Sequence, residues 1–111
     1  MLREDRDSIM ASLQETVELP WRVEPIGPGT ALHGPGIFRE HGVQLVNDRK
    51  DVVPLIGLKK GVRRTDRVLK VFADGRYMPE LQGDSFRGRG WQKRAIRAFE
   101  DAMKAIDALY E

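Results

Sequence analysis

The sequence predicts an α+β fold, with an N-terminal helix, an antiparallel β-meander and a long C-terminal amphipathic helix packed on the sheet. Apolar side chains recur at helical spacing near both ends of the chain, and glycine and proline divide the middle into short β-type runs. With 111 residues, 41% of them apolar, the chain has room for one modest core. We therefore expect a single domain over residues 1–111.

The first helix is expected at residues 4–17. Ile9, Leu13 and Val17 form an apolar stripe there, acids occupy the first turn, and Pro20 ends the helix. The stripe is narrow, so it can cover one edge of a small sheet or pair with a second copy of the chain. A homodimer is therefore one alternative for the assembly.

Three short strands are expected next. The first is WRVEPI at 21–26, and two Gly-Pro-Gly triplets that predict turns follow it. The second contains Val43 and Leu45, and the third lies within residues 52–58. Because proline cannot donate a hydrogen bond to a sheet, Pro54 predicts that this third strand lies at an edge or contains a bulge.

Asp74-Gly75 predicts a hairpin with a two-residue turn, since this dipeptide suits the positive φ angles of such turns. The cross-strand neighbours are then Phe72 and Tyr77, Val71 and Met78, and Val68 and Leu81. A second turn leads residues 85–89 back as a further strand, directly before the last helix. The apolar positions of that helix are Ile96, Phe99, Met103, Ile106 and Leu109 or Tyr110.

The charges are unevenly distributed along the chain. Residues 57–97 contain twelve Lys and Arg against four acids, a net charge of +8, whereas the other residues contain seven against thirteen, a net charge of −6. A segregated basic segment is typical of a surface that binds a polyanion such as nucleic acid, or an acidic protein surface.

The last helix also has its charges in the order that opposes helix stability. FRGRGWQKRAIR, residues 86–97, opens it with cations, although a helix dipole favours anions at that end by about 0.3–1 kcal/mol per charge. A phosphate bound at the helix start would explain this order. Trp91 would stack on a base or, as is commoner, cover the core. The candidate binding residues are Arg87, Arg89, Trp91, Lys93, Arg94 and Arg97, extended by Lys59, Lys60, Arg63 and Arg64.

Residues 66–110 resemble the small DNA-binding domain, three strands and a helix, found at the N-terminus of phage tyrosine integrases and in related plant transcription factors. The likeness rests on the glycine turns DGRY and QGDSF and on the helix KRAIRAFEDAMKAI. It implies that Tyr77 and Phe86 lie on strands and that Phe99 packs the helix against the sheet. In that family the sheet enters the major groove of DNA.

The segment GRGWQKR is also similar to the Gly-x-Gly-x-x-Lys-Arg pattern that opens the last helix of a double-stranded-RNA-binding domain. This resemblance implies that Lys93, Arg94 and Arg97 meet phosphates across a groove. We rank it below the DNA resemblance. A different class of function remains open, in which the basic surface docks on protein, as in a small phage-type inhibitor of a host nucleoprotein machine or a virion component.

Other functions find little support in the sequence. Without cysteine the chain has no disulfide and no thiolate chemistry, His33 and His41 are its only imidazoles, and no carboxylates cluster at metal-ligand spacing. We therefore expect no enzyme activity, cofactor or metal. The N-terminus has charges in place of the apolar run of a signal peptide, and no window is apolar enough to span a bilayer, so we expect a cytoplasmic protein.

Overall fold

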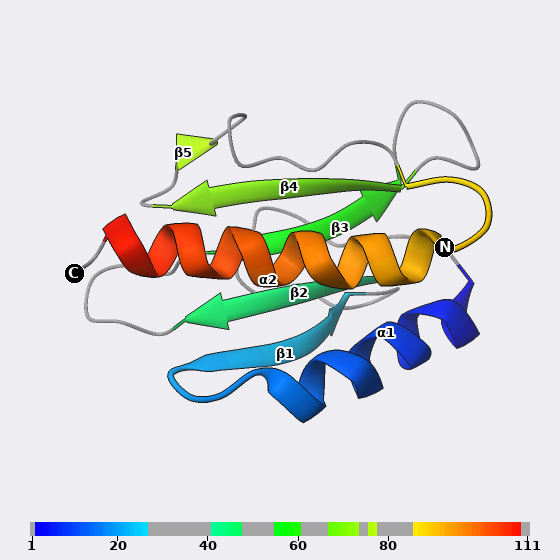
Figure 1. The fold of residues 1–111 in the computed structure, drawn as a ribbon, viewed down its shortest axis with the longest axis horizontal. Helices are drawn as coiled ribbons and strands as arrows, with labels where there is room; N and C mark the ends of the chain where they lie inside the picture. Colours follow the sequence, from blue (N-terminus) through cyan, green and yellow to red (C-terminus); the bar gives the residue numbers. More distant parts are fainter. Residues whose placement is uncertain are drawn as a thin grey trace.

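The computed structural model describes residues 2–26, 41–47, 55–60, 67–73, 76–77 and 86–109. Its strands form one antiparallel sheet in sequence order, and both helices pack on the same face of that sheet (Figure 1). The predicted α+β fold, with the C-terminal helix on the sheet, is confirmed. The elements are α1 (Arg3–Thr16), β1 (Trp21–Ile26), β2 (Gly42–Asn47), β3 (Leu55–Lys60), β4 (Arg67–Ala73), β5 (Arg76–Tyr77) and α2 (Trp91–Leu109).

Helix α1 covers the sheet beside β1 and β2, close to the position expected for the first helix. Ile9 and Leu13 are completely buried, and Val17, which follows the helix, packs against the same core. The helix ends at Thr16, where the N–H of Val17 donates to the carbonyl of Leu13 at 2.8 Å. The apolar stripe of α1 is thus used within the chain.

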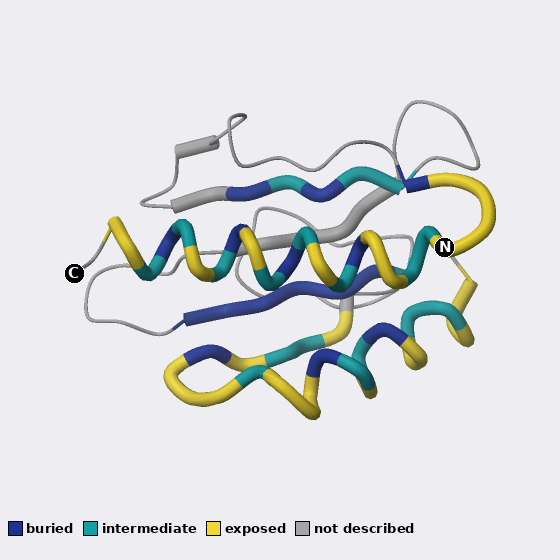
Figure 2. Tube along the Cα trace, in the orientation of Figure 1, coloured by how far each residue is buried: buried dark blue, intermediate teal, exposed yellow. Residues whose placement is uncertain are grey.

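Helix α2 lies across the sheet with one buried side and one exposed side (Figure 2). Phe99 and Ile106 are completely buried, as the apolar spacing predicted, and Ala95 and Ala102 complete the buried face. Alanine at these positions lets the helix backbone approach the strands closely. Neither α1 nor α2, the helices of the described ranges, is long and apolar enough to cross a membrane.

The sheet confirms the predicted hairpin where the structure describes it. β4 and β5 pair with Phe72 opposite Tyr77, whereas Met78 and Leu81, the other expected partners, lie outside the described residues. β3 pairs with β2 on one side and with β4 on the other, so the edge position predicted from Pro54 was wrong, whereas the alternative, a bulge at Pro54, stays a prediction. Pro54 itself lies outside the described residues, immediately before β3 begins.

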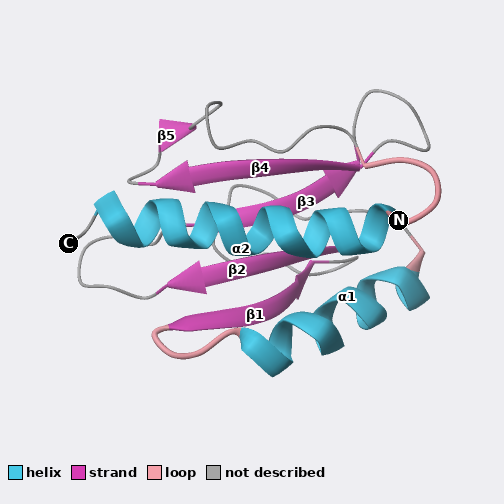
Figure 3. Ribbon diagram, in the orientation of Figure 1, coloured by secondary structure: helices cyan, strands magenta, loops and turns pink. Residues whose placement is uncertain are grey.

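The strand expected at residues 85–89 was also wrong, since residues 86–90 form a loop that leads into α2 (Figure 3). Gly88 and Gly90 have φ angles of 75° and 78°, which an extended strand does not contain. Phe86 bonds to the sheet through an N–H that donates to the carbonyl of Arg67 at 2.8 Å. Its side chain is buried in the core, so Phe86 anchors the loop.

Candidate nucleic-acid interface

The loop before α2 depends on two glycines in the left-handed region. Gly88 and Gly90 alternate with Arg87 and Arg89, so an arginine side chain directly precedes each glycine. A side chain at either glycine would strain the backbone, whatever space surrounds it. All four residues are exposed, which makes the loop a short basic projection from the helix start.

Arg94, in the first turns of α2, holds this loop in place. Its Nη1 donates to the carbonyl of Arg89 at 2.9 Å, and its Nη2 donates to the carbonyl of Arg87. One guanidinium therefore binds two loop carbonyls that are two residues apart. Arginine has the forked arrangement of N–H donors that suits such a pair, and lysine lacks it. Arg94 was predicted as a phosphate ligand, but in this structure its donors serve the loop.

A second arginine, which the sequence did not single out, forms the base of the site. Arg67 donates from Nη1 to the carbonyl of Phe86 at 3.2 Å, and its guanidinium lies 3.8 Å from the centroid of the Trp91 ring. Trp91 is half-buried and packs against the core, in agreement with its commoner interpretation as a cover. One face of its ring is occupied by Arg67, so that face is not open to a nucleobase.

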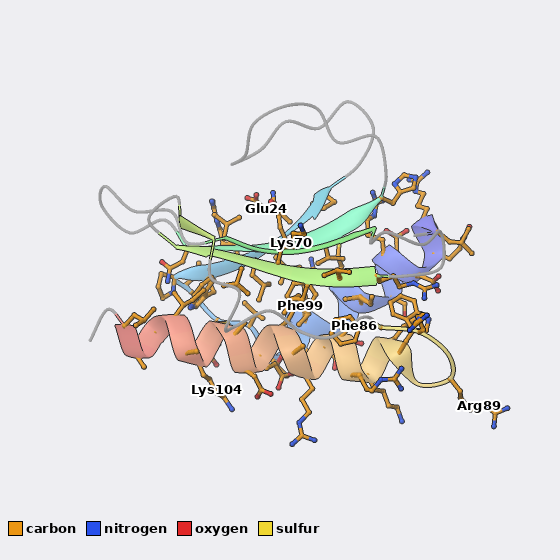
Figure 4. All side chains as sticks on the ribbon, turned by 90° about the horizontal axis from the view of Figure 1, so that it is seen from above. Glu24, Lys70, Phe86, Arg89, Phe99 and Lys104 are labelled. Carbon is orange, nitrogen blue, oxygen red and sulfur yellow. The ribbon has the colours of Figure 1, made fainter. Side chains whose placement is uncertain are left out.

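The exposed side of α2 continues the positive surface. Lys93 and Arg97 are exposed and one helical turn apart, and no acid lies in the first turn of the helix. Arg89 projects from the loop away from the sheet, as does Lys104 further along the helix (Figure 4). In the part of the chain that the structure describes, no carboxylate pairs with Arg89, Lys93 or Arg97.

These observations define a surface that we call the basic edge. It consists of Arg87, Arg89, Lys93, Arg94 and Arg97, which the structure brings together at the start of α2. Lys60 ends β3 opposite Arg67, with Lys59 before it, so the backbone of both approaches the same end of the sheet. Arg63 and Arg64 lie outside the described residues.

Gln92 connects the basic edge to α1, a contact that no local sequence pattern predicted. Its Nε2 donates to Asp5 at 2.9 Å, and its Oε1 accepts from the hydroxyl of Ser8 at 3.1 Å. Helix α1 is also linked to the start of β2, because Arg6 lies 3.1 Å from Nδ1 of His41, the residue before that strand. These contacts join residues that are far apart in the chain, and neither Gln92 nor His41 belongs to a local sequence motif. The tertiary structure was therefore needed to find them.

Among the described residues, no group of three or more His, Asp or Glu side chains could hold a metal ion. His41 is engaged by Arg6, and His33, the other imidazole, lies outside the described residues. Comparison of the chain with protein families, curated proteins and solved structures found no match.

Proposed function

We propose that this chain is a small cytoplasmic nucleic-acid-binding protein that binds duplex DNA through the basic edge. One observation carries the proposal: exposed cations gather at the start of α2, and three of them, Arg89, Lys93 and Arg97, have no carboxylate partner among the described residues. Like charges held together on one surface repel one another, and a polyanion relieves that repulsion. The resemblance to phage integrase domains extends the proposal to a phage or mobile-element protein.

The loop adds a reason to expect a phosphate ligand in particular. Arg94 draws the carbonyls of Arg87 and Arg89 towards itself. Because the C=O and N–H of a trans peptide point in opposite directions, the N–H groups of Gly88 and Gly90 face away from Arg94. Backbone N–H groups next to arginine residues and a helix start are the kind of donors that bind phosphate oxygens well.

Measured affinity for a short DNA duplex at several salt concentrations tests the proposal. If three cations each neutralise one phosphate, the slope of log K against log salt is about −2.7 or steeper, since each phosphate contributes about −0.9. The triple variant Arg89→Glu, Lys93→Glu, Arg97→Glu should lose duplex binding. Its melting temperature should stay the same or rise, because acids suit a helix start.

Two further measurements complete this test. Lys104→Glu changes the charge of an exposed residue on the same helix and should bind almost as wild type, whereas Arg97→Glu should bind several-fold more weakly. If the wild-type chain shows no duplex affinity at moderate salt, DNA binding is wrong and the protein-docking alternative stands. If the triple variant still binds the duplex, the DNA-binding surface is not the basic edge.

A further inference from the structure

On the sheet face opposite the helices, the residues of β2 are buried. Residues 43 and 45 point to the helices, so alternation directs Gly42, Gln44 and Val46 to the other face, yet all three are buried. Glu24 and Lys70 lie in the same cross-strand row as Gln44 and are seen on the side of the sheet away from α2 (Figure 4). Side chains of β2 are therefore not available to meet the edges of DNA bases.

The described charges on that face are of mixed sign, with Arg22 and Lys70 beside Glu24. Arg22 pairs with Glu24 at 3.5 Å, so the positive charge of Arg22 is partly compensated. The side chain of Glu24 is 22% exposed and would repel an approaching phosphate.

The basic edge has the opposite properties. Its side chains are long, exposed cations, which bind phosphates well but distinguish bases only when they are placed deep in a groove. Beyond Arg97 the outer side of α2 carries Glu100 and Asp101, which limit the favourable surface to the loop and the first two turns. A short surface of this kind can touch the backbone of a duplex without inserting a whole helix.

We infer that the protein binds duplex DNA through the phosphate backbone and does so without preference for base sequence. This inference rests on the proposed function and specifies its ligand as the duplex backbone. Phosphate contacts supply affinity and position, whereas base contacts supply specificity. The basic edge exposes cations for the first. The groups at the same site that could supply the second, the forked guanidinium of Arg94 and one face of the Trp91 ring, are engaged within the chain.

Two kinds of binding experiment test the inference. Selection from a random duplex pool should enrich no motif, and unrelated duplexes of equal length should bind with affinities within about threefold, far below the 10³-fold or larger ratios of specific proteins. The edge variant Lys93→Gln, Arg97→Gln should reduce the salt slope by about 1.8, as the loss of two phosphates requires. The sheet-face variant Arg22→Gln, Lys70→Gln removes the same charge and should leave affinity and slope unchanged.

The outcomes separate this inference from the proposed function. Duplex binding with an enriched motif, or a loss of affinity in the folded sheet-face variant, overturns the inference and leaves DNA binding intact. Absence of duplex binding by the wild-type chain overturns both. Circular dichroism of each double variant establishes that it is folded before affinity is compared, and Arg97→Gln alone replaces the edge variant if that variant unfolds.

Discussion

Arg94 shows how a single side chain shapes the basic edge. It binds the carbonyls of Arg87 and Arg89, which are also the carbonyls that trypsin attacks when it cleaves after these arginines. Arg94→Lys keeps the positive charge but lacks the rigid planar fork with which arginine binds the two carbonyls at once. If the clasp contributes about 1 kcal/mol, its loss opens the loop roughly fivefold more often. We expect trypsin to cleave after Arg87 and Arg89 correspondingly faster, as followed by mass spectrometry of the first fragments.

The control is Arg97→Lys, the same substitution at an exposed position of the same helix that binds no loop carbonyl. Its early cleavage pattern should match that of the wild type. Equal rates in the Arg94→Lys and wild-type chains would mean that the clasp does not hold the loop in solution. Arg94 would then return to the set of cations available to phosphate.

Strand β2 illustrates an element whose two faces are both buried, although two of its buried side chains, Gln44 and Asn47, are polar. Gln44 is completely buried, and neither atom of its amide has a hydrogen-bond partner among the described residues. An unsatisfied buried polar group costs about 1–3 kcal/mol, and methionine has a similar length and no such group. We therefore expect Gln44→Met to raise the free energy of unfolding by about 1 kcal/mol, measured by urea denaturation.

Gln92→Met supplies the matched control, because the amide of Gln92 bonds to both Asp5 and Ser8. The same chemical change should lower stability there, by about 0.5–1.5 kcal/mol for each net hydrogen bond lost. A clear loss of stability in Gln44→Met would contradict the interpretation and would show that the amide of Gln44 has a partner in solution.

At the scale of the whole molecule, the packing of α1 favours a monomer. Ile9 and Leu13, the centre of the stripe that the sequence offered for self-association, are buried against the sheet. The Cα radius of gyration is 13.0 Å, close to the value of about 13 Å for a compact chain of 100 residues. We expect light scattering to give a mass near 12.6 kDa at all protein concentrations. A mass that doubles as the concentration rises would show a dimer interface elsewhere.

The sequence by itself determined the local elements of this protein. The spacing of Ile9 and Leu13 predicted α1, the spacing of Phe99 and Ile106 predicted the buried side of α2, and Asp74-Gly75 predicted the pairing of Phe72 with Tyr77. These features depend on periodicity and turn chemistry within a few residues, which a single sequence records directly. The cations of the basic edge were found for the same reason, because they lie within eleven residues of one another, from Arg87 to Arg97.

The tertiary structure decided how these elements combine. Strand order made β3 central despite Pro54, and the anchoring of Phe86 at Arg67 replaced a predicted strand with a loop. The roles of Arg67 and Arg94 became visible only there, since each depends on carbonyls whose direction the loop conformation sets. Such contacts depend on which backbone groups remain unpaired after the sheet and helices have formed. Neither the type of a residue nor its spacing in the sequence shows which groups these are.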